Sequence, residues 1–145
     1  MPPEGMVHAL ELVHEMLKPG GRLVDLHPLP WAPSIELRSP QKGVQIGYLQ
    51  EHDDFVEYAQ AELAIVQEIL GGWFRLLLQD SFDFHFQFST LAEMYQYMEE
   101  DWNDAFLPPD VASKAEELMS RAPPGAELVI VERIRICLME RMPSD

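Results

Sequence analysis

The sequence is poor in residue types that several classes of protein require. Its 145 residues include one cysteine, Cys137, so no disulfide can form within the chain. We therefore expect a reducing compartment, the cytoplasm. A membrane-spanning helix needs about 18 consecutive apolar residues, and no apolar run in the sequence approaches this length. The N-terminal segment MPPEGMVHALE also lacks the cationic flank and apolar stretch of a signal peptide.

Cations are scarce as well. The chain has 10 Lys and Arg against 25 Asp and Glu, which gives a formal net charge of −15. Nucleic acids and anionic membranes are bound through clustered cations, so we expect neither as a partner. Residues 51–104 hold 13 acidic residues and a single arginine, Arg75. This acidic segment is either a solvated face that keeps the protein soluble or a surface for a basic protein partner.

The composition is otherwise that of a folded protein. Apolar residues make up 47% of the chain and charged residues 24%, which allows a buried core. The sequence contains no internal repeat and no low-complexity tract. A chain of this length is typical of one domain, so we expect residues 1–145 to form a single domain.

Apolar spacing and helix-ending residues predict four helices. The first covers residues 6–17 and ends at a Lys-Pro-Gly-Gly turn. The third opens at Thr90 with a capping box and runs to about residue 103. The fourth covers about residues 110–121, between two Pro-Pro pairs. The second, residues 53–70, has the clearest stripe at helical spacing, formed by Phe55, Ala59, Leu63, Val66 and Leu70.

Three main strands are predicted, at residues 23–26, 73–88 and 127–140. The second of them alternates between apolar and polar residues, which predicts that one face enters the core through Phe82, Phe84, Phe86 and Phe88. Residues 44–49 alternate more weakly and are a candidate short strand. Residues 27–43 contain four prolines and are predicted to be a surface loop.

The segment ALELVHEMLKPGGRLVDLHP, residues 9–28, resembles one part of the class I S-adenosylmethionine-dependent methyltransferases. In that family a helix ends in a Leu-Lys-Pro-Gly-Gly turn and leads into a strand of the parallel sheet. The later order of a glycine-led strand, a capped helix and a final strand is similar to the family's C-terminal half, where the last two strands pair antiparallel. The resemblance implies an α/β fold with a small mixed sheet, like the C-terminal half of a Rossmann-like methyltransferase.

The sequence departs from this family where the cofactor would bind. The family holds S-adenosylmethionine with a glycine-rich turn after the first strand and an acidic residue after the second. No G-x-G pattern occurs here, and the two Gly-Gly pairs follow predicted helices. We therefore expect no cofactor to be bound by this chain alone. S-adenosylmethionine would bind only if a partner completes the site.

Two residues follow the strand 23–26 and are candidates for substrate binding. Ligands of open α/β sheets lie beyond the carboxyl ends of strands, where His27 and Trp31 fall. The alternative is that both are ordinary loop residues. No metal site is expected, because His8 and His14 are six residues apart and point to different sides of a helix. No catalytic residue is assigned.

These observations lead to two functional hypotheses. The first is a methyltransferase-like protein without its own cofactor site, either the substrate-side subunit of a split methyltransferase or a catalytically inactive remnant. The second is a non-catalytic acidic module that binds a basic protein. In the methyltransferase family the strand 23–26 would have a neighbour on its free side. We expect that edge to be covered by a second copy in a two-fold dimer or by a complementary methyltransferase half.

Overall fold

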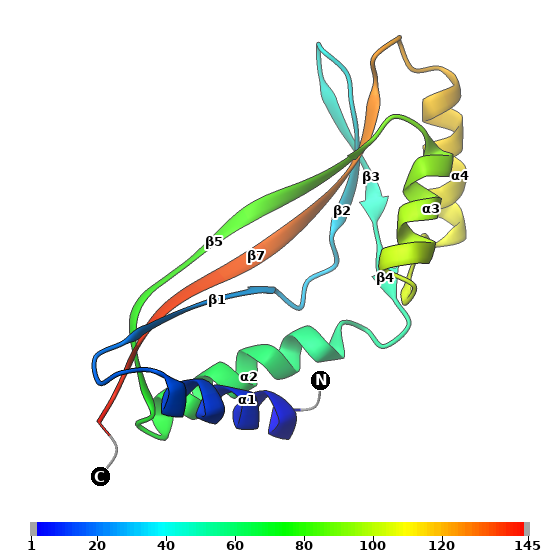
Figure 1. The fold of residues 1–145 in the computed structure, drawn as a ribbon. Helices are drawn as coiled ribbons and strands as arrows, with labels where there is room; N and C mark the ends of the chain where they lie inside the picture. Colours follow the sequence, from blue (N-terminus) through cyan, green and yellow to red (C-terminus); the bar gives the residue numbers. More distant parts are fainter. Residues whose placement is uncertain (1–2, 144–145) are drawn as a thin grey trace. The chain divides into compact units, whose positions relative to one another are not determined.

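A computed structural model describes residues 3–143, which form four helices and an antiparallel sheet (Figure 1). The first half of the chain holds α1 (Pro3–Met16), β1 (Arg22–Pro28), β2 (Ser34–Arg38), β3 (Gly43–Tyr48), β4 (Gln50–Glu51) and α2 (Val56–Leu70). The second half holds β5 (Phe74–Phe88), α3 (Leu91–Asp101), β6 (Ala105–Phe106), α4 (Pro109–Ser120) and β7 (Glu127–Arg141). The four helices and the three long strands lie close to the positions that the sequence predicts. Within residues 3–143, no helix is long and apolar enough to cross a lipid bilayer.

The sheet is organised around β7, which pairs with three other strands, β1, β2 and β5. β1 pairs antiparallel with residues 134–140 of β7, and β2 pairs antiparallel with residues 127–131. β3 pairs with β2, and β5 pairs with β7. In Figure 1, β5 and β7 run in opposite directions, as the sequence predicts for the last two strands. The prediction of a mixed sheet is wrong. β1 and β5 run in the same direction, but β7 lies between them and pairs antiparallel with both, so the two are not neighbours in the sheet.

Strand β2 is not predicted from the sequence, because the prolines around it indicate a loop. The segment 27–43 is predicted as a loop, yet its prolines flank the strand: Pro33 precedes it and Pro40 follows it. Between them, Ile35 and Leu37 alternate with polar residues, and both are buried. Proline is tolerated next to a strand because only the strand interior needs its N–H groups.

Contacts divide the described residues into two compact units, and the prediction of a single domain stays a prediction. Among the described residues, the first unit comprises residues 3–30, 56–82 and 133–143, and the second comprises residues 31–55 and 83–132. Because β5 and β7 are long, each contributes residues to both units. Each unit has a core of its own.

The core of the first unit lies between two helices and the sheet. α1 and α2 lie side by side (Figure 1) and cover one face of the strands of this unit. His14 of α1 is buried there, and its Nε2 lies 2.9 Å from the carbonyl oxygen of Met142. The buried cluster consists of Leu10, Ala64, Ile65, Phe74, Cys137 and Met139.

The stripe that identifies α2 in the sequence does not face this core. Ala64 and Ile65 are buried, whereas Leu63 and Val66 are about half exposed, at 48% and 47%. Leu70 at the helix end is 83% exposed. α2 is apolar on two sides, so its periodicity predicts a helix without telling which side is buried.

In the second unit α4 lies against β2 and β3 and α3 lies against α4. The close approach of α4 depends on Gly47 of β3, since a Cβ at this position would lie 2.6 Å from a methyl group of Val111. The predicted cap at Thr90 is confirmed, since the Glu93 N–H donates to Thr90 Oγ1 over 3.1 Å, while the Glu93 carboxylate accepts from the N–H of Ser89, one residue before the cap. The buried apolar residues of this unit include Ile35, Met94, Ala115, Leu128 and Ile130.

The four phenylalanines of β5 are only partly core, contrary to the prediction. Phe86 packs against Tyr97 and Trp102, with ring centroids 5.3 and 6.3 Å apart. Phe82 and Phe84 remain 40% and 47% exposed. The alternation of β5 is therefore real, but helix residues cover this face only near the C-terminal end of the strand.

Candidate functional site

A group of charged side chains in the first unit lies on the helix-covered side of β1. Leu23 packs against the core formed with α1 and α2. Because strand residues alternate, Asp25 and His27 point to the same side. The antiparallel register places Cys137 opposite Asp25 and Arg135 opposite His27. Both residues therefore face α2.

Four side chains meet at this point and form hydrogen bonds with one another. Nδ1 of His27 contacts Asp25 of the same strand, and Nε2 lies 2.5 Å from Oε1 of Glu62 on α2. Arg135 Nε donates to the same Glu62 oxygen over 3.1 Å. We call Asp25, His27, Glu62 and Arg135 the histidine cluster. His27 itself is only 7% exposed.

The contacts favour the protonated form of the histidine. Burial acts to lower the pKa of His27, but the hydrogen bonds and negative charges of Asp25 and Glu62 outweigh it and raise the pKa. For Glu62, burial acts to raise the pKa, but the hydrogen bonds and positive charges of Arg135 and His27 lower it. When His27 is protonated, the cluster combines an imidazolium and a guanidinium with two carboxylates, and these charges balance.

This arrangement limits what His27 can do. In the protonated form both ring nitrogens donate to carboxylates, so the imidazolium has no lone pair with which to accept a proton from a substrate. A direct substrate contact would have to displace Asp25 or Glu62. The role of His27 in substrate binding stays a prediction. The contacts described here connect α2 to the two neighbouring strands.

Trp31, the other candidate, is not brought into this cluster. It lies in the link between β1 and β2, belongs to the second unit and is 60% exposed. An exposed tryptophan is available for a partner or a ligand, so its predicted role also stays open.

The described residues do not provide the turn that S-adenosylmethionine would need. Such a turn leads from a strand into a helix and contains glycine, so that the backbone can approach the cofactor closely. The strand-to-helix turns here are residues 52–55, 89–90 and 107–108, and none contains glycine. The glycines with positive φ, Gly20, Gly72 and Gly125, lie instead in turns that lead into strands. These residues do not fit the cofactor.

The structure gives no cluster suited to a metal ion either. Across residues 3–143, no three His, Cys, Asp or Glu side chains are placed so that they could hold one. Cys137 is a buried thiol in the core of the first unit, and burial together with the charges of Asp25 and Glu62 raises its pKa. A thiol with a raised pKa is a poor nucleophile.

The second unit contains a buried carboxyl group, that of Glu132, which is a weaker acid than an ordinary glutamate. Glu132 is 7% exposed, and burial together with the negative charge of Glu51 raises its pKa to about 7. Trp102 Nε1 donates to Glu51, which retains that carboxylate near Glu132. A carboxyl group that titrates near neutrality can act in proton transfer. The second unit also has a pocket beside α3 and β6, but Glu132 is not among the residues that line it.

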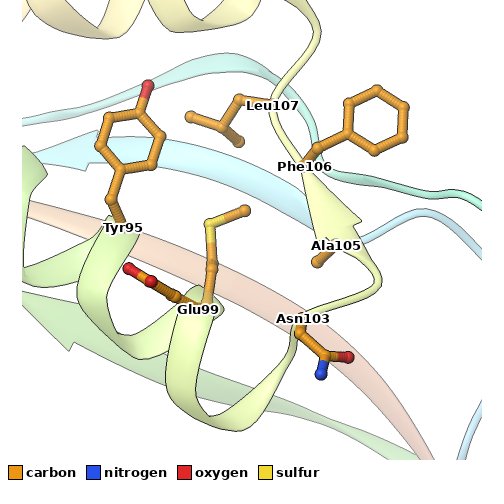
Figure 2. A pocket seen from close by; sticks show the side chains of 7 residues that line it. Tyr95, Glu99, Asn103, Ala105, Phe106 and Leu107 are labelled. Atoms are coloured by element: carbon orange, nitrogen blue, oxygen red, sulfur yellow. The ribbon is translucent and has the colours of Figure 1, made fainter.

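That pocket opens beside α3 and β6 and has a volume of about 400 Å³ (Figure 2). Its walls combine apolar side chains with a phenol, an amide and one carboxylate, Glu99. Burial and the negative charge of Glu116 raise the pKa of Tyr95. The lining residues are Tyr95, Met98, Glu99, Asn103, Ala105, Phe106 and Leu107.

Comparison with known proteins provides no relative: no protein-family model, no curated protein and no solved structure matches the chain.

Sequence reasoning located His27 but missed its partners. Asp25 could have been found, since residues two apart in a strand share a face. Glu62 and Arg135 lie 35 and 108 residues away from His27 in the sequence, and no local pattern links them to it. The pocket of the second unit had no sequence signal beyond the acidic character of residues 51–104.

Proposed function

We propose that this chain is a methyltransferase-like domain without its own cofactor site, and that a complementary half-domain carrying the glycine-rich turn completes it. In this role the chain supplies the substrate side of a split methyltransferase. The observation that carries the proposal is the open edge of β1 and the exposed apolar side chains beside it. β1 is the strand that follows the Lys-Pro-Gly-Gly turn.

β1 is the first strand in the sheet order and pairs with β7 along one edge. Its side chains opposite α1 and α2 are apolar and open: Val24 and Leu26 are 56% and 57% exposed. The register pairs them with Leu138 and Ile136 of β7, which are partly buried. An open strand edge beside an apolar surface favours the addition of a further strand and its covering helix.

The topology of the first unit is consistent with the proposed ancestry. A helix, the Lys-Pro-Gly-Gly turn and β1 follow one another as the resemblance requires. The last two long strands, β5 and β7, pair with each other, as in the C-terminal half of the family. The missing elements on the free side of β1 are those that would carry the cofactor turn in such a fold.

The first test is a calorimetric titration of the purified chain with S-adenosylmethionine. We expect no binding, because the described strand-to-helix turns contain no glycine. Micromolar binding by the chain alone would contradict the proposal, since it would require a cofactor site within these residues.

A second test concerns the complementary half. A neighbouring reading frame that encodes a strand followed by a G-x-G turn would be co-expressed with this chain. We expect the two products to copurify and to bind S-adenosylmethionine together. The substitution Leu26→Lys should abolish this association, whereas Leu78→Lys, at an equally exposed leucine of β5, should not. Equal loss in both variants would argue against β1 as the contact.

The pocket of the second unit favours a second candidate function, the binding of a basic protein. Among its lining residues Glu99 is acidic and none is cationic, while Met98, Phe106 and Leu107 offer apolar walls. A lysine or arginine side chain matches this combination of an apolar stem and a positive end. The surrounding excess of acidic residues would attract such a partner over a longer range.

This candidate is tested by titrating the chain with an oligolysine peptide at low and high salt. We expect salt-sensitive binding that the substitution Glu99→Gln weakens several-fold. Glu100→Gln is the matched control, because Glu100 lies next in α3 but does not line the pocket. Equal weakening in both variants would show general attraction to an acidic surface, without use of the pocket.

A further inference from the structure

The exposed side of α2 presents a regular row of apolar residues that neither proposed function uses. Four of them, Val56, Leu63, Val66 and Leu70, are 45%, 48%, 47% and 83% exposed. Ala59 is exposed between them. We call these five residues the α2 stripe. A helix in a globular protein normally turns such a row toward its core, so an uncovered row indicates a binding surface.

The spacing of the α2 stripe indicates what kind of surface covers it. Its residues follow one another at intervals of 3, 4, 3 and 4 positions. This is the heptad spacing with which one helix packs into the holes of another. A second helix with the same spacing can therefore pack against the stripe along its whole length.

The charge around the stripe indicates whether the occupying helix belongs to a second copy of this chain or to a basic partner. The chain carries a net charge of −15, yet the stripe is flanked on one side by the uncharged Gln60 and Gln67 and on the other by Ile69 and Glu62, whose charge is compensated by Arg135. Two of the three acidic residues of α2, Glu62 and Glu68, take part in the histidine cluster or are buried. A second copy of this acidic protein can therefore approach along α2 without strong repulsion, and a basic partner would find little to bind.

We propose that the α2 stripe is a homodimer interface in which α2 of one copy packs antiparallel against α2 of a second copy. When the two-fold axis passes between Leu63 and Val66, Leu63 faces Val66 of the partner subunit. Ala59 then faces Leu70 of the partner subunit, so that a small residue lies opposite a large one.

The antiparallel arrangement also separates the remaining charges. The two copies of Glu57 lie at opposite ends of the helix pair, roughly 22 Å apart along its axis. This distance exceeds the Debye length of about 8 Å at physiological ionic strength, so their repulsion is screened. This interface is independent of β1, which leaves the edge of β1 free for the complementary half proposed above.

The experiment is sedimentation equilibrium on the purified full chain over a range of concentrations. We expect a particle of twice the 16.7 kDa chain mass. Leu63→Glu and Val66→Lys should each raise the dimer dissociation constant at least tenfold, while circular dichroism shows a folded chain. Leu70→Glu should act in the same direction, and its 83% exposure leaves the monomer fold undisturbed.

Mixing the first two variants tests the register. Because Leu63 faces Val66 of the partner subunit, Leu63→Glu and Val66→Lys chains should form a heterodimer that neither forms with itself. Val24→Glu is the matched control on β1 and should remain dimeric. A monomeric unmodified chain, a Val24→Glu chain that alone loses the dimer, or a mixture that fails to associate would overturn the proposal.

Discussion

His27 on β1 and Arg135 on β7 lie directly opposite each other in the antiparallel sheet. A protonated His27 and Arg135 in such a cross-strand position would repel each other. Glu62 from α2 binds both of them, and Asp25 binds the other side of His27. The pair is therefore tolerated because a helix supplies the compensating charge, and the same contacts hold the helix on the sheet.

The histidine cluster should make stability depend on pH in a defined way. The pKa of His27 is raised above 6.5, so its contribution is full below pH 6.5 and is lost as the pH rises through the raised value. The pKa of Glu62 is lowered below 4.5, so its contribution is present above pH 4.5 and is lost as the pH falls. The cluster should stabilise the protein most between these two values.

The substitution Glu62→Gln tests this dependence. We expect the free energy of unfolding at pH 5.5 to fall by about 1 to 2 kcal/mol, and the pKa of His27 to decrease. Denaturant titration measures the first and NMR titration of the His27 ring protons the second. Glu57→Gln, on the same helix but outside the cluster, is the control. An unchanged pKa of His27 in Glu62→Gln would contradict the assigned contacts.

Glu132 should oppose folding at alkaline pH. Its pKa of about 7 in the folded protein lies above its ordinary value of 4.5. The folded state therefore binds the proton more tightly, and stability falls as the pH rises from 4.5 to 7. Glu132→Gln should remove this fall and be more stable than the unmodified chain at pH 8, by roughly 1 to 3 kcal/mol. A parallel pair of stability curves for the two proteins would exclude this effect.

Glu68 is a buried carboxyl group with an unsatisfied oxygen in the first unit. It is 3% exposed, its Oε2 has no hydrogen-bond partner, and burial and the charge of Glu11 raise its pKa. Glu68→Met should stabilise the protein by about 1 kcal/mol, because an apolar chain of similar size avoids the desolvation cost. Thermal unfolding at neutral pH measures the change. A lower melting temperature would mean that Glu68 makes a contact worth more than its burial costs.

Gly47 should be intolerant of a side chain. A Cβ there would lie 2.6 Å from Val111 of α4, so Gly47→Ala forces the helix away from β3. We expect a loss of about 1 to 3 kcal/mol in the free energy of unfolding. The double variant Gly47→Ala/Val111→Ala should recover part of this loss, because it removes the overlapping methyl groups. Additive losses would show that steric contact is not the cause.

Local patterns in the sequence determined the helices and the long strands of this protein. The helical spacing of apolar residues in α2, the Thr90 cap and the alternation of β5 each depend on neighbouring residues, and each lies at its predicted place. Hydrogen bonding within a helix or a cap involves residues a few positions apart, so its signals are readable without a fold.

Only the tertiary structure decided which sides of these elements are covered. α2 and β5 carry apolar residues on surfaces that remain open, such as Leu63 and Phe84, because covering them depends on elements distant in the sequence. The histidine cluster has the same origin, since β1, α2 and β7 each supply part of it. Burial and charge compensation are sums over the whole fold, and they are settled only when separated segments meet.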